Sequence, residues 1–440
     1  MARLFGTDGV RGVANRDLTP DLALALGRAA GLVLAPGGGR VVVGRDTRLS
    51  GPMLHAALTA GLCSAGASVL GAGILPTPGV AWLTRREDAA AGAVISASHN
   101  PVPDNGIKFF SAVGTKVSAD EETSIEELLA QTPDELPTGE AIGGVDPVED
   151  GASRYVEHLL TSIDGSLGGL RVVVDCAYGA AFAVGPEAFR RAGAEVVALH
   201  DSPDGARINV DCGSTSLDTL AKVVVSEGAA FGVGFDGDAD RALAVDETGA
   251  VIDGDRIIAL AALHLKERGE LDGGLVVTTV MANLGLRRAL EAAGIEVVTV
   301  PVGDRFVAEA MTEHGAVIGG EQSGHVIFAE HATTGDGVLT GLKLAEIVAA
   351  SGRPLSDLAA VFEPYPQVLL NVRIADRGAL EGAAEVWERV RAAEESLGES
   401  GRVLVRASGT EPLVRVMVEA EDPATADRVA RDLAALVESK

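Results

Sequence analysis

A strand–helix–strand pattern recurs along this chain and restricts its fold more than any other feature. Residues 170–199 begin with an apolar, β-branched run, continue through a helical stretch that stops at Gly193, and end in a second apolar run. Residues 274–300 repeat this order, with Gly294 at the matching stop. Residues 18–96 alternate helix and strand signals in a similar way. The sequence therefore predicts three related α/β units whose functional loops follow the strand ends.

The C-terminal segment has a different pattern. It holds three apolar strand-like runs, a long helical stretch from Gly378 to about Leu397 and a final helix, which is typical of a smaller α+β domain. An acidic stretch that contains Pro and Gly, residues 133–150, is predicted to be a linker. We expect four domains, at residues 1–150, 151–253, 254–364 and 365–440.

Charge and composition exclude several classes of partner. The 440 residues include 36 Lys and Arg against 63 Asp and Glu, and the net charge of -27 repels nucleic acids and anionic membrane surfaces. The N-terminus has no targeting pattern, and no apolar run reaches the length of a membrane helix. Cys63, Cys176 and Cys212 lack metal-type spacing and are interpreted as reduced thiols. We expect a cytoplasmic protein that binds neither nucleic acid nor membrane.

Three Asp residues at alternating positions form the segment of the chain that most clearly indicates a chemical role. Asp236, Asp238 and Asp240 lie in "GFDGDADRALAV", between one apolar strand and the next. Carboxylates so close repel one another unless a cation lies among them, and oxygen ligands alone select a hard ion such as Mg²⁺. The alternative is an acidic turn without an ion. The sequence favours a Mg²⁺ site with open positions for a phosphate.

A serine beside a histidine ends one of the predicted strands, in "ISASHNPVPDNGIKFF". The flanks of Ser98 do not match the G-x-S-x-G of a hydrolase nucleophile. Because adjacent side chains on an extended segment point apart, we expect His99 to be poorly placed as the base of Ser98. A serine that carries a phosphoryl group needs a metal and cations, which the Asp loop, Arg241 and Lys108 would supply. A plain strand-end cap is the alternative for Ser98.

Two further loops carry ligand-binding residue types. In "RASGTEPLVR" a turn between strands would bring hydroxyls, backbone N–H groups and two guanidinium groups onto a phosphate. The residues concerned are Arg406, Ser408, Gly409, Thr410 and Arg415. In "GGEQSGH" the residues Glu321, Ser323 and His325 offer polar groups to sugar hydroxyls or an amine, with a plain loop as the alternative. Neither a Walker A sequence nor a full dinucleotide-binding pattern occurs, so a nucleotide is not expected.

Five motifs in one order give the chain a family resemblance. They are "GTDGVRG", "SASHNP" with "DNGIKFF", "DGDADR", "GEQSGH" and "RASGTEP", and together they resemble the α-D-phosphohexomutase family across essentially the whole chain. The resemblance implies three similar α/β domains with mixed sheets and a smaller C-terminal α+β domain around a central cleft. The four domains would carry, in order, the phosphoserine, metal-binding, sugar-specificity and phosphate-binding loops. Ser98 would be the phosphoserine, and one of its phosphate oxygens would complete the Mg²⁺ ligands Asp236, Asp238 and Asp240.

The resemblance also implies a reaction, that of an isomerase acting by intramolecular phosphate transfer. Within the family the chain is most similar to the bacterial branch that interconverts glucosamine 6-phosphate and glucosamine 1-phosphate, a step toward UDP-N-acetylglucosamine and the cell wall. Glucosamine or glucose 1,6-bisphosphate would be the intermediate and activator. Arg11, Lys108 and Arg241 would hold the second phosphate, and either Lys108 or His99 would move the proton.

Several alternatives stay open at this point. Gln322 in the sugar loop favours glucosamine, because members that act on glucose or mannose phosphates typically have Met there, and such a mutase is the nearest alternative. A Mg²⁺-dependent phosphatase and a phosphosugar-binding protein are more distant ones. A homodimer is possible, but the sequence does not decide the oligomeric state.

Overall fold

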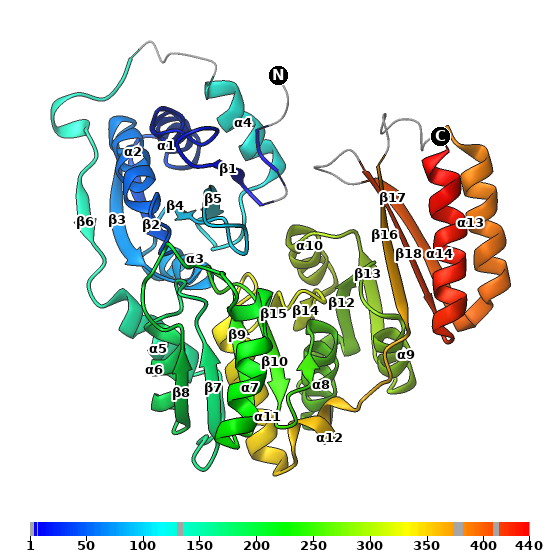
Figure 1. The fold of residues 1–440 in the computed structure, drawn as a ribbon. Coiled ribbons are helices and arrows are strands. Elements are labelled where there is room, and N and C mark those ends of the chain that lie inside the picture. Colours follow the sequence, from blue (N-terminus) through cyan, green and yellow to red (C-terminus); the bar gives the residue numbers. More distant parts are fainter. Residues whose placement is uncertain (1–3, 7, 130–134, 374–381, 408–412, 440) are drawn as a thin grey trace. The chain divides into compact units, whose positions relative to one another are not determined.

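The computed structural model describes residues 4–6, 8–129, 135–373, 382–407 and 413–439 (Figure 1). The chain divides into two compact units, one formed by residues 1–280 with 295–360 and the other by residues 281–294 with 361–440. Among the helices of these described ranges, none has both the length and the apolar composition needed to cross a bilayer.

A mixed six-stranded sheet begins the first unit, in the order β1-β5-β4-β2-β3-β6. Its strands are β1 (Val10–Val13), β2 (Gly39–Arg45), β3 (Ala67–Ile74), β4 (Ala91–Ile95), β5 (Asp104–Ser111) and β6 (Val145–Pro147). Its helices are α1 (Pro20–Leu34), α2 (Gly51–Ser64), α3 (Thr77–Arg86) and α4 (Ala119–Leu129). Strand β6 corrects one prediction: residues 145–147 pair in parallel with β3 at the sheet edge, where a linker was expected. Polar, exposed edge strands of three residues give almost no pattern in sequence.

The second sheet has five strands in the order β11-β10-β9-β7-β8. They are β7 (Arg171–Asp175), β8 (Glu195–Leu199), β9 (Phe231–Phe235), β10 (Ala242–Asp246) and β11 (Val251–Ile252), with helices α5 (Gly151–Leu160), α6 (Val184–Arg191) and α7 (Asp218–Glu227). Strand β7 runs parallel to both β8 and β9, whereas β10 and β11 are antiparallel. The carboxyl ends of β7, β8 and β9 therefore meet at one edge of the sheet.

The third sheet, β13-β12-β14-β15, completes the first unit. Its strands are β12 (Leu275–Thr279), β13 (Glu296–Val300), β14 (Ile318–Gly320) and β15 (Val326–Phe328), with helices α8 (Gly254–Arg268), α10 (Asp304–His314), α11 (Gly337–Ser351) and α12 (Leu355–Ala359). Strand β12 is parallel to β13 and β14, and β15 is antiparallel to β14. Three mixed sheets with helices thus confirm the predicted α/β units.

The second unit holds a three-stranded antiparallel sheet in the order β16-β18-β17. Its strands are β16 (Gln367–Arg373), β17 (Gly401–Ala407) and β18 (Leu413–Ala420), and its helices are α9 (Leu284–Ala292), α13 (Ala384–Leu397) and α14 (Pro423–Glu438). An apolar core lies among β16, β17, β18, α13 and α14. The predicted smaller α+β domain is confirmed by this sheet.

Candidate active site

The Ser98 loop is anchored from several sides after it leaves β4. Ser98 is 1% exposed and adopts a left-handed backbone conformation, with φ of 50°. Its N–H donates to Ser96 Oγ at 2.9 Å, and its carbonyl oxygen accepts a hydrogen bond from Asn209 Nδ2 at 2.9 Å. Its hydroxyl donates a short hydrogen bond to Asp236 Oδ2. The serine predicted to carry chemistry thus touches the predicted metal-binding loop.

The relation between Ser98 and His99 corrects the expectation from sequence. Ser98 Oγ lies 3.3 Å from His99 Nδ1, within hydrogen-bonding distance. Side chains of adjacent residues point apart only on an extended strand, and the left-handed φ of Ser98 removes that condition. Burial, followed by repulsion from Arg241 and Arg11, lowers the pKa of His99 to about 4, so its imidazole is neutral at pH 7.

The three carboxylates of the loop after β9 converge. One oxygen from each of Asp236, Asp238 and Asp240 lies within 4.8 Å of the others, and all three residues are buried. In the part of the chain that the structure describes, Asp238 Oδ1 and Asp240 Oδ1 are buried without a hydrogen-bond partner. Burial, followed by repulsion from Asp240 and Asp238, raises the pKa of Asp236 well above its ordinary value. Unpartnered oxygens of this kind fit a hard metal ion.

Lys108 is the buried cation of this cluster. Its Nζ lies 2.8 Å from Asp238 Oδ2, 3.4 Å from Asp240 Oδ2 and 3.5 Å from Asp8 Oδ2. Burial lowers the pKa of Lys108, but the attraction of Asp238 and the two other carboxylates outweighs burial and holds the pKa well above its ordinary value. Strand β5 therefore delivers a charged ammonium group to the loop after β9.

Two guanidinium groups border the same cluster. Arg241 Nε lies 3.9 Å from Asp240 Oδ1, and Arg11 Nη1 donates to Asn100 Oδ1 at 3.0 Å. Within the described residues, the Nε atoms of Arg241 and Arg11 are buried and have no hydrogen-bond acceptor. Buried donors without acceptors next to a carboxylate cluster can bind an anion such as a phosphate.

The sugar loop predicted from "GEQSGH" joins β14 to β15 and contributes His325. Gly335 N–H donates to His325 Nε2 at 2.9 Å, so a neutral ring carries its proton on Nδ1, which lies 3.9 Å from Asp240 Oδ2. Glu321 is 8% exposed and accepts a hydrogen bond from Gly303 N–H, whereas Ser323 is exposed. His325 therefore reaches the carboxylates, while Glu321 N–H donates to the carbonyl oxygen of His325 at 2.9 Å and Ser323 lies at the middle of the loop.

The predicted phosphate loop belongs to the second unit. Arg406 and Arg415 are directly opposite each other on β17 and β18, so both guanidinium groups lie near one end of this sheet. Burial, followed by repulsion from Arg415, lowers the pKa of Arg406. Like charges on opposed positions are unfavourable unless an anion offsets them. Ser408, Gly409 and Thr410 lie outside the described residues.

Arg48 is a residue that sequence reasoning missed. It is fully buried, pairs with Asp46 at 2.9 Å and donates to four backbone carbonyl oxygens, three in the loop after β4 and one at the start of β5. The acceptors are Ser98, Asn100, Pro101 and Asp104. An Arg after a strand is usually a surface residue, so no signal in the sequence marks this contact.

A second missed group links the "GTDGVRG" motif to helix α10. Lys116 is held between Asp8 and Asp304, each at 2.5 Å from its Nζ, and Asp304 Oδ2 lies 3.9 Å from His325 Nε2. Thr77 Oγ1 donates to Asp238 Oδ2 at 2.5 Å. Asp8 lies in a motif that the sequence analysis singled out, but its partners are distant in the chain and could not be read from it.

Four domain families together match nearly the whole chain. They are described as phosphoglucomutase/phosphomannomutase alpha/beta/alpha domain I (residues 2–135), domain II (residues 153–249) and domain III (residues 253–365), and the C-terminal domain (residues 369–436). The resemblance drawn from the five motifs is thereby confirmed.

Similar proteins extend over the full length. A phosphoglucosamine mutase of Moorella thermoacetica is 56% identical over 96% of each chain, and one of Rhodococcus jostii is 55% identical over 100% of each chain. A solved phosphoglucomutase/phosphomannomutase family protein of Burkholderia thailandensis is 28% identical, covers 99% of this chain and 97% of its own, and has a TM-score of 0.84.

A more distant structure shares the fold alone. The N-acetylphosphoglucosamine mutase of Aspergillus fumigatus, solved with GlcNAc-6P and magnesium, is 19% identical, covers 99% of this chain and 95% of its own, and has a TM-score of 0.73. Sequence similarity over the full length and the matching domain order lead to one conclusion. The chain belongs to the phosphoglucomutase/phosphomannomutase family.

Proposed function

We propose that this chain interconverts glucosamine 6-phosphate and glucosamine 1-phosphate. One observation supports the type of reaction: the Ser98 hydroxyl is hydrogen-bonded to Asp236, within a cluster of three buried carboxylates. The substrate is supported by relatives of 51–56% identity over at least 96% of this chain, all described as phosphoglucosamine mutases.

We place Mg²⁺ among Asp236, Asp238 and Asp240, together with a phosphate oxygen on Ser98. Oxygen-only donors and two buried, unpartnered carboxylate oxygens in the described part of the chain support a hard ion there. When bound, Mg²⁺ offsets the negative charge that develops on the transferring phosphoryl group. The remaining chemistry is assigned to the side chains of the chain.

Phosphorylated Ser98 donates its phosphoryl group to the sugar and later accepts a different one from it. The bond between Ser98 Oγ and phosphorus breaks while a bond forms between phosphorus and the free sugar hydroxyl, whose proton passes to Ser98 Oγ. The bisphosphate then transfers its other phosphoryl group to Ser98, and the sugar oxygen left behind takes up the proton that Ser98 Oγ releases. His99, neutral and 3.3 Å from Ser98 Oγ, and Lys108 are the two candidate proton carriers.

The cations around the cluster would hold the phosphates. Arg11 and Arg241 are assigned to the phosphate near Ser98, because their buried Nε atoms lack acceptors among the described residues. Arg406 and Arg415, with Ser408, Gly409 and Thr410, are assigned to the distal phosphate. Glu321, Ser323 and His325 are assigned to the sugar, with Gln322 beside them.

Comparing three sugars on one preparation tests this proposal. We expect kcat/KM to be higher for glucosamine 6-phosphate than for glucose 6-phosphate or mannose 6-phosphate, because an acidic loop can hold a protonated 2-amino group. A ratio for glucose 6-phosphate equal to or above that for glucosamine 6-phosphate would overturn the substrate but not the mutase reaction. Net release of phosphate without isomer formation would favour a phosphatase.

A further inference from the structure

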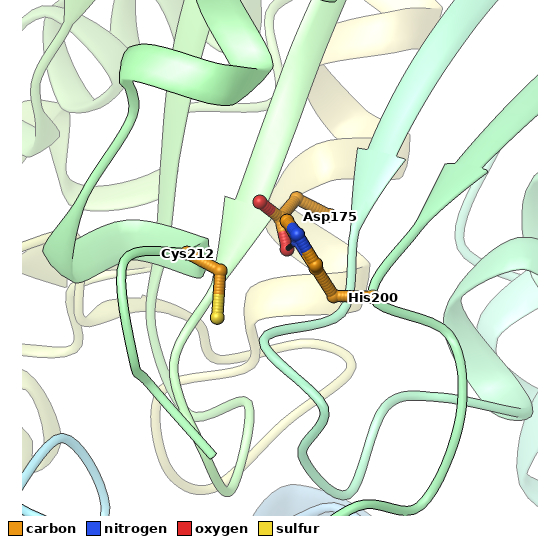
Figure 2. A group of neighbouring side chains, drawn as sticks. All are labelled: Asp175, His200 and Cys212. Carbon is orange, nitrogen blue, oxygen red and sulfur yellow. Dashed lines mark hydrogen bonds and ion pairs between the residues drawn. The ribbon is translucent and has the colours of Figure 1, made fainter. Parts of the chain in front are cut away.

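A second cluster of metal-ligand side chains lies in the same domain as the Asp loop. Asp175 ends β7, His200 follows β8, and Cys212 comes after the loop that continues from His200 (Figure 2). Because β7 runs parallel to β8 and β9, this cluster and the Asp236 loop lie at one edge of one sheet. The assigned reaction uses none of these three residues.

The donor atoms of this cluster converge. One atom from each of Asp175, His200 and Cys212 lies within 4.8 Å of the other two. His200 Nδ1 donates a hydrogen bond to Asp175 Oδ1 at 2.9 Å. Asp175 and Cys212 are fully buried, whereas the His200 side chain is 19% exposed and opens the cluster to solvent. The group thus combines close donors with partial exposure of one ligand residue.

The Asp175 carboxylate is oriented by the backbone on both sides. Ala177 N–H donates to Oδ1 at 2.9 Å, and Gly213 N–H donates to Oδ2 at 3.0 Å. Outer hydrogen bonds of this kind fix the direction of ligating carboxylates in metal sites. Because Gly213 follows Cys212 directly, the second bond also holds the cysteine backbone against the carboxylate.

We propose that Asp175, His200 and Cys212 form a second metal site, separate from the carboxylate cluster, which binds one zinc ion. Thiolate, imidazole and carboxylate are the donor types of zinc sites, whereas Mg²⁺ prefers oxygen donors alone. Three protein ligands leave the fourth tetrahedral position to water. This inference revises the view of Cys212 as an ordinary thiol and does not depend on the proposed sugar reaction.

The geometry requires only a small adjustment to accept the ion. Nitrogen and oxygen ligands of tetrahedral zinc lie about 3.3 Å apart, close to the 2.9 Å seen here. The ion takes the place of the proton between Nδ1 and Oδ1, and the neutral imidazole keeps a proton on Nε2. Sulfur and nitrogen ligands of tetrahedral zinc lie about 3.6 Å apart, so Cys212 Sγ, within 4.8 Å of the other two donors, must approach by at most about 1.2 Å. Residues 201–212, which connect it to His200, contain neither helix nor strand.

The thiol must release its proton when the metal binds. Burial and the nearby carboxylates of Asp175 and Asp211 raise the pKa of Cys212 to about 12. A divalent cation in direct contact offsets this cost, since a coordinating thiol is deprotonated. The same loop carries Asn209, which donates to the carbonyl of Ser98, so bound zinc would also restrain a contact of the catalytic loop.

A cobalt titration of the full chain tests the site directly. The protein is stripped with chelator, saturated with Mg²⁺ to occupy the carboxylate cluster, and titrated with Co²⁺. We expect one equivalent to produce the thiolate-to-cobalt charge-transfer absorption, which an oxygen-only site cannot give, and one equivalent of Zn²⁺ to remove it. Absence of this absorption would overturn the proposal and leave the cluster as a hydrogen-bonded group.

Matched variants identify the ligands. Cys212→Ser should abolish the absorption, while Cys63→Ser, a half-buried thiol in the first sheet domain, should keep it. His200→Asn should weaken cobalt binding by at least about tenfold, and Asn tolerates the left-handed φ of 49° at this position. A folded His200→Asn protein with unchanged affinity, or an absorption that persists in Cys212→Ser, would contradict the assignment.

Discussion

Two clusters that contain buried carboxylates lie at one edge of the five-stranded sheet. They differ in whether the carboxylate oxygens have hydrogen-bond partners. After β9, Asp238 Oδ1 and Asp240 Oδ1 are buried without a hydrogen-bond partner in the described part of the chain. After β7, both oxygens of Asp175 accept hydrogen bonds, from Ala177 and His200 on one side and Gly213 on the other. Unpartnered buried carboxylates cost stability and are kept for function, whereas satisfied ones stabilise the fold.

The largest expected effect concerns the serine beside the unpartnered cluster. Ser98→Ala should lower mutase turnover by at least about 10³-fold, because no neighbouring group replaces the nucleophile. Phosphate should map to Ser98 in the purified active protein by mass spectrometry, and the alanine variant should lack it. Full activity in the variant, or phosphate found only on other residues, would contradict the catalytic role assigned to Ser98 and the unpartnered carboxylate cluster beside it.

Asp236→Asn should lower the mutase activity without lowering the stability of the fold. The asparagine can still accept from Arg241 N–H with its oxygen and donate to Ser98 Oγ with its amide, while one of three repelling charges is lost. We expect turnover to fall by about 10²-fold or more and the midpoint of urea unfolding in chelator to stay equal or rise. A clear loss of stability would show that this cluster is structural after all.

Addition of Mg²⁺ should stabilise the fold through the carboxylate cluster and not through the cluster of Asp175, His200 and Cys212. Mg²⁺ at about 100 times its Kd should raise the free energy of unfolding by about 2.7 kcal/mol, since it binds the folded chain alone. The rise should shrink strongly in Asp236→Asn and persist in His200→Asn, which alters only the mixed-donor cluster. Thermal unfolding with and without Mg²⁺ measures it, and equal shifts in both variants would contradict the separation of the sites.

The same two clusters show what the sequence could and could not predict. Asp236, Asp238 and Asp240 alternate within five residues, so their convergence could be predicted from the sequence alone. Asp175, His200 and Cys212 are separated by a helix, a strand and a loop, and only the parallel register of β7 and β8 brings them together. A metal-type spacing was therefore absent from the sequence although the side chains meet.

The remaining differences have local causes. The three α/β units were predictable because apolar periodicity and the stops at Gly193 and Gly294 repeat, and both glycines adopt the positive φ that such stops require. The contact of Ser98 with His99 depends on one left-handed residue, and the burial of Arg48 depends on four carbonyl oxygens within a distant segment, residues 98–104. Neither feature leaves a periodic signal.

The smallest effect concerns Asp175→Asn and should have the opposite character to Asp236→Asn. An asparagine keeps one acceptor oxygen, so its NH₂ group must face a donor, and the N–H of Ala177 or Gly213 then stays buried without an acceptor. Such a loss costs about 1–3 kcal/mol of unfolding free energy, measured by urea unfolding in chelator so that no metal contributes. Asp201→Asn is the matched control, because Asp201 is exposed next to His200 and should change stability little. If Asp175→Asn is as stable as the wild type while Asp236→Asn is not, the satisfied cluster does not stabilise the fold and the contrast between the two clusters is reversed.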